Sequence, residues 1–240
     1  MENKIVNTFS IVGYDPETEE LGIAVQSKFL AVGAVVPWAK AKVGAVATQA
    51  LANLDYGEKG LKLLEEGFSP KEVIEKLRKE DENDQSRQVG IVAADGNSVS
   101  FTGSDCYDWA GGITGQNFAC QGNILVGEET VKAMASKFKK TEGELAERLV
   151  LALEAGQKAG GDKRGRQSAA LLVVKENGSY GGYNDRYIDL RVDDHETPIQ
   201  KLKSVLKTSY LYFEDNVRQK NEPTEQKSDK PSVLVNKTVP

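Results

Sequence analysis

The single histidine of this 240-residue chain, His195, limits the kinds of catalysis that the sequence can support. A Ser-His-Asp or Cys-His mechanism needs a histidine that accepts the proton of the nucleophile. His195 follows Asp193 and Asp194 just before an expected helix start, where a histidine is more often solvated or caps the helix. The residues therefore favour a base other than imidazole.

A threonine that begins a chain carries a base of its own. A free α-amino group has an unperturbed pKa of about 7.7–8.0, so part of it accepts protons near neutral pH. Thr8 begins the first expected strand and is placed for this role as a nucleophile. The alternative is that Thr8 is a β-favouring residue at a strand edge, with no part in chemistry.

Two arginines, Arg164 and Arg166, flank Gly165 directly before an apolar strand. A guanidinium group binds a carboxylate through two parallel hydrogen bonds, so this stretch predicts a site for an anionic group of a substrate. The alternative is a solvated turn whose arginines pair with nearby acidic residues.

Other kinds of site find little support. No phosphate-binding Gly-x-x-x-x-Gly-Lys-Ser/Thr loop is present, and the glycines around Gly160 do not follow a strand as a dinucleotide site requires, so no cofactor is expected. Asp193, Asp194 and His195 have the chemistry of metal ligands, but neighbouring residues on a strand diverge, which leaves a metal site as an alternative only. Cys106 and Cys120 make neither a disulfide framework nor a metal cluster.

The elements that must position these residues are strands first and helices between them. Alternating or apolar runs predict strands at 8–14, 21–27, 43–48, 88–94, 98–102, 168–174 and 187–192. Helices are expected after the capping boxes that begin at Ser69 and Thr141, over the apolar face from Val131 to Phe138, and from Thr197-Pro198 onward. Grouped strands and helices predict an α+β fold with sheets inside and helices outside.

Composition bounds the domain and its partners. The net charge of −5 and the pI of about 5.2 exclude a basic nucleic-acid-binding face. No apolar run approaches the roughly 18 residues of a membrane span, and residues 1–6 lack the apolar core of a secretory signal, so we expect a cytoplasmic protein with no membrane partner. We expect one domain over residues 8–213, preceded by an arm (1–7) and followed by a flexible polar tail (214–240).

The sequence also resembles a known family, domain of unknown function family one thousand twenty-eight, which is similar to the N-terminal nucleophile (Ntn) hydrolases. The resemblance covers Thr8 to about Tyr210 and is carried by segments 8–12, 24–33, 44–50, 121–123, 160–170, 183–186 and 193–195. It implies a four-layer α-β-β-α sandwich and hydrolysis of an amide-like bond by an N-terminal threonine. In several relatives the threonine directly follows the initiator Met, whereas residues 1–7 precede Thr8 here, so the Asn7–Thr8 bond must be cleaved for the mechanism to hold.

Further roles follow if Thr8 is the nucleophile. The amide of Gln49 and the backbone at Thr48 could stabilise the oxyanion, with Asn123 as a second donor. Lys28 could lower the pKa of the Thr8 hydroxyl or amine. The alternative is that these residues have no part in catalysis. Thr48 and Gln49 then end a strand, Asn123 lies in a turn, and Lys28 is a surface lysine.

Three hypotheses of function remain. The first is a hydrolase of a small, anionic amide or peptide-like metabolite, with Thr8 as nucleophile, Arg166 holding the anionic group and no cofactor. The second is a non-catalytic binding or assembly protein on the same scaffold, and the third is a metal-assisted hydrolase. We expect a homodimer, because closed dimers are the commonest soluble oligomers.

Overall fold

The architecture combines two antiparallel sheets with five α-helices. The computed structural model describes the backbone of residues 8–221 and the side chains of residues 8–210. The larger sheet has six strands in the order β10-β9-β2-β1-β8-β7, and the smaller has four in the order β3-β4-β5-β6. The strands are β1 Thr8–Asp15, β2 Glu20–Ser27, β3 Pro37–Lys40, β4 Gly44–Ala50, β5 Arg87–Ala93, β6 Ser98–Thr102, β7 Trp109–Gly115, β8 Phe118–Leu125, β9 Ser168–Val174 and β10 Arg186–Val192.

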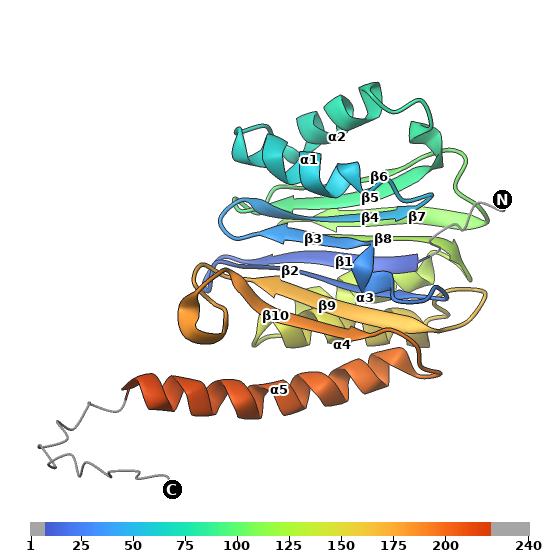
Figure 1. Ribbon diagram of the computed structural model, residues 1–240. Helices are drawn as coiled ribbons and strands as arrows, with labels where there is room; N and C mark the ends of the chain where they lie inside the picture. The colour runs from blue at the N-terminus through green and yellow to red at the C-terminus, as the bar shows by residue number, and fades with distance from the viewer. Residues whose placement is uncertain (1–7, 222–240) are drawn as a thin grey trace, which may run out of the picture.

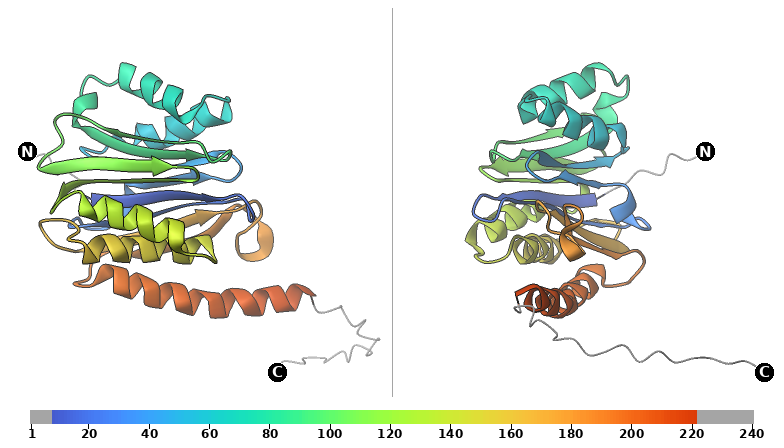
Figure 2. Two further views of the ribbon diagram at one scale, coloured as in Figure 1. Left: turned by 180° about the vertical axis from the view of Figure 1, so that it is seen from behind. Right: turned by 60° about the vertical axis from the view of Figure 1, so that its left-hand side comes forward.

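The helices lie on the two outer sides of the sheets, as Figures 1 and 2 show. Helices α1 and α2 cover the four-stranded sheet, whereas α3, α4 and α5 lie on the side of the six-stranded sheet. The helices are α1 Asp55–Glu65, α2 Pro70–Lys79, α3 Glu129–Lys140, α4 Leu145–Lys158 and α5 Pro198–Asn221, with short 3-10 turns at Val32–Ala34, Asp84–Ser86 and Tyr180–Gly182.

Three clusters of buried side chains hold these layers together. On β1 and β2 the side chains alternate, so Phe9 and Ile11 pack among α3 and α4, while Val12 and Val25 pack against Ala45 of the four-stranded sheet. A third cluster fills the space between the four-stranded sheet and helices α1 and α2. The mixed α and β composition with two sheets between helices agrees with the predicted α+β class.

Strands β1, β2 and β4 were predicted from sequence. The predicted hairpin at the start of the chain is confirmed: Thr8 pairs with Ser27 and Asp15 with Glu20. Asp15 accepts a hydrogen bond from the backbone of Glu17 at 3.0 Å, which is the Asx geometry expected of the Asp-Pro turn. Strand β4 pairs with β3 on one side and β5 on the other, as its apolar run indicated.

Four elements were not predicted from sequence, and in three of them glycine or proline weakens the signal of the element. Strand β7 contains Gly111, Gly112 and Gly115, and strand β3 begins at a proline. The neighbour of β7, strand β8, was not predicted either. Helix α1 carries Gly57 and Gly60 and has no side-chain cap at its N-terminus, so it lacks the usual start signal.

One of the two predicted capping boxes is correct. The Ser69 hydroxyl accepts from the backbone of Glu72, and the Glu72 carboxylate accepts from the backbone of Ser69, directly before α2. The box predicted at Thr141 is wrong, because α4 begins at Leu145 without a side-chain cap. The Thr141 hydroxyl instead donates to the carbonyl of Lys137 at 2.8 Å and so closes the end of α3.

The predicted end of the domain at Phe213 falls inside a helix. Helix α5 begins at Pro198, buries Ile199, Leu202 and Leu206, and continues to Asn221. An anchored helix extends at little cost once it is nucleated, which a composition-based boundary does not register. The predicted arm (1–7) and the rest of the predicted tail (222–240) lie outside the described residues. No helix in the described part of the chain is long and apolar enough to cross a membrane.

Candidate functional site around Thr8

Thr8 lies between the two sheets at the point where the described fold begins. As the first residue of β1, it shares a strand face with Ser10 and Val12, which turn toward the four-stranded sheet. Its hydroxyl Oγ1 donates to Ser27 Oγ at 3.1 Å, and its carbonyl accepts from Gln49 Nε2 at 3.3 Å. The side chain is fully buried. Thr8 is thus fixed by β2 on one side and by β4 on the other.

Gln88 on β5 organises the predicted amide residues. Its Oε1 atom accepts from Gln49 Nε2 at 2.7 Å and from Asn123 Nδ2 at 2.8 Å. Its own Nε2 donates to Thr102 Oγ1 at 2.9 Å and to the carbonyl of Gly122 at 2.8 Å. Gln88 therefore joins strands of both sheets and brings two predicted site residues together.

Ser10 and Gln121 complete the buried polar network. The Ser10 hydroxyl donates to Gln49 Oε1 at 2.6 Å and accepts from Gln121 Nε2 at 2.7 Å. We did not single out Gln88, Ser10 or Gln121 as site residues from sequence. The available signal was a polar side chain within a largely apolar strand, which marks a position where a buried polar group must find a partner.

The predicted arginine loop lies beside the same end of the six-stranded sheet. The backbone of Gln167 donates to the carbonyl of Ser27 at 2.9 Å, and Lys28 Nζ donates to the carbonyl of Arg166 at 3.4 Å. Buried Asp162 receives Arg164 through Nη2 at 2.8 Å and Nε at 3.2 Å, and the backbone of Lys28 at 3.1 Å. Arg164 thus orders the loop, whereas the exposed Arg166 side chain has no ion pair among the described residues.

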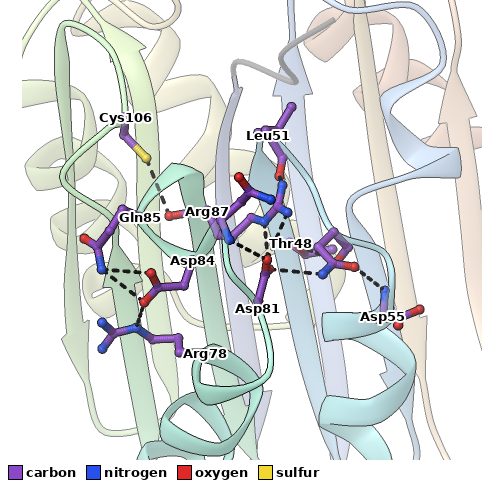
Figure 3. Close-up of polar contacts among 11 residues, drawn as sticks. Thr48, Leu51, Asp55, Arg78, Asp81, Asp84, Gln85, Arg87 and Cys106 are labelled. Carbon is purple, nitrogen blue, oxygen red and sulfur yellow. Dashed lines mark hydrogen bonds and ion pairs between the residues drawn. The ribbon is translucent and has the colours of Figure 1, made fainter. Parts of the chain in front are cut away.

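Thr48, whose backbone was expected to help stabilise the oxyanion, turns its side chain away from Thr8. Its hydroxyl donates to the carbonyl of Asn53 at 3.0 Å, and its backbone donates to Val36 at 3.1 Å. Neighbouring residues on a strand face opposite ways, so Gln49 points between the sheets while Thr48 points toward α1. Figure 3 shows Thr48 beside the polar cluster of Asp81 and Arg87 on that side.

His195 bonds to the backbone directly before α5. Its Nδ1 atom accepts from the backbone of Thr197 at 2.9 Å, directly before α5. Asp194 accepts from Gln167 at 3.2 Å, and Asp193 pairs with Arg191 at 3.4 Å. Among residues 8–210 no group of three histidine, cysteine, aspartate or glutamate side chains has the arrangement to hold a metal. The metal-assisted alternative therefore has no ligand set in this region.

The chain matches a known protein family over most of the described fold. The model of the Family of unknown function (DUF1028) matches residues 8–202, and so begins at Thr8. The chain belongs to this family. A crystal structure of a DUF1028 protein from Silicibacter pomeroyi is similar, with 30% sequence identity, a TM-score of 0.77, and coverage of 85% of this chain and 89% of that one.

Two further comparisons assign no activity to this member of DUF1028. Anbu (ancestral beta-subunit) from Yersinia bercovieri covers 86% of this chain and 96% of its own, at 8% identity and a TM-score of 0.38, which is too low to assign a fold. No curated protein matches.

The cysteines are poor nucleophiles in this DUF1028 chain. Burial raises the pKa of Cys106 to about 11 and raises the pKa of the fully buried Cys120 further. Only the thiolate reacts readily, and a raised pKa lowers its share near neutral pH.

Proposed function

We propose that this chain is the precursor of an Ntn-type hydrolase of amide or peptide-like bonds, activated by hydrolysis of the Asn7–Thr8 bond. The observation that carries the proposal is the double anchoring of Thr8, through its hydroxyl to Ser27 and through its carbonyl to Gln49. Such fixed placement is what a nucleophile needs to attack without reorganisation. The family resemblance to an Ntn sandwich supports the same assignment.

In the processed chain the α-amine of Thr8 serves as the base. It takes the Oγ1 proton as Oγ1 attacks the acyl carbon, and it returns the proton to the departing amine. The resulting ester on Thr8 is then hydrolysed by water, which releases the acid and restores the hydroxyl.

Asn123 is the better oxyanion donor of the two predicted amides. Gln49 Nε2 already donates to both Gln88 and the Thr8 carbonyl, so Gln49 positions Thr8. Asn123 Nδ2 gives one hydrogen to Gln88, which leaves its second N–H for the developing negative charge. Asn123 is 1% exposed, and in a dry site such a bond is stronger than in water.

Arg166 and Lys28 select an anionic substrate in this scheme. Both side chains are exposed at the end of β2, next to Ser27. Neither has an acidic partner among the described residues, so their charges are available to a carboxylate. Thr8 itself has no exposed surface, so the processed chain must admit substrate at this end of the sheets.

The test compares the full-length protein with a chain whose first residue is Thr8. Intact mass identifies each N-terminus, and amine release from a panel of N-acyl amino acids and dipeptides measures turnover. We expect activity only in the Thr8-first chain, its loss in Thr8→Ala and its retention in Thr8→Ser. Thr18→Ala is the control and should retain activity, because it removes an exposed threonine hydroxyl in the turn between β1 and β2. Equal turnover by the Thr8-first chain and its Thr8→Ala variant would refute the proposal.

A second candidate is a non-catalytic binding or assembly protein. The complete burial of Thr8 favours it, because the amide network then serves to hold the two sheets together. In that case the Thr8-first chain turns over nothing, and Thr8→Ala lowers only stability. The proposed homodimer is tested separately by light scattering after gel filtration.

A further inference from the structure

Strand β8 changes its course directly after Asn123. The next residue, Ile124, has a φ of 50°, in the left-handed region. A β-branched residue rarely adopts this conformation, because its Cβ then crowds the backbone. Ala50, which directly follows Gln49, also has a positive φ, of 65°. Two amide residues of the network around Thr8 are therefore each followed by a strained residue, and such strain gathers at functional sites.

The strained residue of β8 lies in a β-bulge. Gly122 of β8 pairs with Gly111 of β7. Three residues further along β8, Leu125 pairs with Trp109, which is only two residues away from Gly111. The extra residue on β8 makes the bulge, and a bulge beside an active site commonly turns a side chain in a new direction.

The bulge lets Asn123 and Leu125 face opposite sides of the sheet. In a regular strand, residues two positions apart share a face. Asn123 points between the two sheets, where it donates to Gln88 at 2.8 Å, whereas Leu125 is buried in the core cluster against α3 and α4. Without the reversal at Ile124, either the leucine would lie between the sheets or the amide would lie in the apolar core.

Two backbone hydrogen bonds hold Ile124 in its conformation. Its N–H donates to the carbonyl of Tyr107 at 3.2 Å, and its carbonyl accepts from the backbone of Lys163 at 3.0 Å. Lys163 belongs to the predicted arginine loop. This loop therefore fixes the backbone directly after Asn123, on the side of the six-stranded sheet where Thr8 begins β1.

We propose that Ile124 is a positioning residue, which holds the Asn123 amide toward Thr8 by means of this bulge. The orientation of the amide follows from its partner. Gln88 donates to the carbonyl of Gly122, which can only accept, so Gln88 Oε1 must face the Asn123 Nδ2 atom. A donor fixed in this way does not reorganise when negative charge develops beside it. The inference rests on the proposed function, in which Asn123 binds the oxyanion.

Substitutions at Ile124 test the left-handed conformation. Alanine is ordinarily more stabilising than glycine, because glycine leaves the unfolded chain more freedom. At a positive φ the order reverses, because glycine has no Cβ to crowd the backbone. We therefore expect Ile124→Gly to melt at a higher temperature than Ile124→Ala. The matched pair Ile113→Gly and Ile113→Ala, at a half-buried position of β7 without a positive φ, should show the usual order. The usual order at both positions overturns the proposal.

Two variants at Lys163 test whether the bulge acts through Asn123. Lys163→Pro removes the N–H that bonds to Ile124, and Lys163→Ala removes the same side chain but keeps this N–H. Lys163 is the second residue of a turn that the Gly165 N–H closes on the Asp162 carbonyl at 3.0 Å, a position that accepts proline. In NMR spectra of the full-length protein, we expect the assigned side-chain amide signals of Asn123 to move in Lys163→Pro relative to Lys163→Ala. Unchanged signals overturn the positioning role, whether or not the protein is an enzyme.

Turnover by the Thr8-first chain gives the catalytic readout. An oxyanion donor acts in the transition state, so we expect Lys163→Pro to lower kcat at least about tenfold relative to Lys163→Ala, with KM unchanged. In an Asn123→Ala background the two variants should have equal kcat, because the donor is already gone. Equal kcat of the two variants in an otherwise active wild-type chain overturns the inference. A wild-type chain without turnover refutes the proposed hydrolase alone, and the melting order and the amide signals still decide what Ile124 positions.

Discussion

Arg87 and Asp81 form an ion pair with Arg87 Nε 2.8 Å from Asp81 Oδ2, and their side chains are only 11% and 9% exposed. The pair ties Asp81, the second residue beyond α2, to Arg87, the first residue of strand β5, and Gln88 is the second residue of that strand. It therefore links the helix layer to the strand that orders the network around Thr8.

Removing one partner of this pair should be costly. Asp81→Asn leaves the Arg87 charge buried and uncompensated, so we expect unfolding free energy to fall by about 3 kcal/mol at pH 7 in urea titrations. Glu176→Gln is the control, because its ion pair with Lys42 is 53% exposed on both sides and should contribute less than about 1 kcal/mol. Equal losses in the two variants would contradict the structural role of Asp81.

The same pair predicts a dependence on pH. The hydrogen bonds from Arg87 lower the pKa of Asp81 below its ordinary value. A carboxylate with a lowered folded-state pKa stabilises the protein above its unfolded pKa, near 3.9, and loses that contribution as the pH falls further. Wild-type stability should therefore drop below about pH 4 by more than that of Asp81→Asn, measured by urea titration at several pH values.

Glu20 should have the opposite dependence. Burial, which outweighs the 3.2 Å contact with Lys175, raises its pKa. The folded protein thus binds this proton more tightly than the unfolded chain, so the stabilisation is present at low pH and is lost as the pH rises through the folded-state pKa. We expect Glu20→Gln to raise the thermal midpoint at pH 7 and to differ less from wild type near pH 4. A lower midpoint at pH 7 would contradict this account.

Gln88 should matter more for stability than its polar character suggests. Gln88→Ala leaves Gln49 and Asn123 without their shared acceptor between the sheets, so we expect a loss of about 2–4 kcal/mol in chemical unfolding. Gln116→Ala, an exposed glutamine, is the control and should change stability by less than about 0.5 kcal/mol. A small effect in both variants would mean that the network around Thr8 does not couple the sheets.

Alanine substitutions at Ser69 and at Thr141 should lower the stability of the protein by different amounts. Ser69→Ala removes a formed capping box and should cost about 1 kcal/mol. Thr141→Ala removes only a hydroxyl bond to the previous turn, so its cost should be below about 0.5 kcal/mol in the same thermal or urea unfolding experiment. Equal costs would restore the sequence-based prediction of a cap at Thr141.

These outcomes show which features a sequence can reveal. Local signals found β1, β2 and α2, because the Asp-Pro turn and the Ser69 box act within a few residues. Helix α1 could not be predicted from local sequence signals, because tertiary packing determines one of its residues. A Cβ atom at Gly57 would lie 2.2 Å from the ring of Trp38, so the helix carries a glycine that packing requires and propensity disfavours.

The candidate site was likewise predicted only in part from the sequence. Gln49 was predicted to act on Thr8 chemistry from its place at the end of a strand, but the shared acceptor Gln88 was not predicted, because its contacts depend on which faces of two sheets meet. Thr48 was grouped with Gln49 by adjacency alone, and strand alternation separates them. The arginine loop does precede a strand, β9, as predicted, but its approach to Ser27 and the contact of Arg164 with Asp162 required the fold.

The order of strands in the larger sheet also bears on how the protein reaches its native state. The N-terminal hairpin occupies the centre of that sheet: Ser10 contacts Gln121, 111 positions later, and Leu21 pairs with Val174. Segments synthesised first must therefore wait for neighbours made last, a topology associated with slow folding. During synthesis on the ribosome the β1–β2 hairpin would expose both of its edges, and stopped-flow refolding of the complete chain should lack a submillisecond phase that recovers the full tryptophan signal.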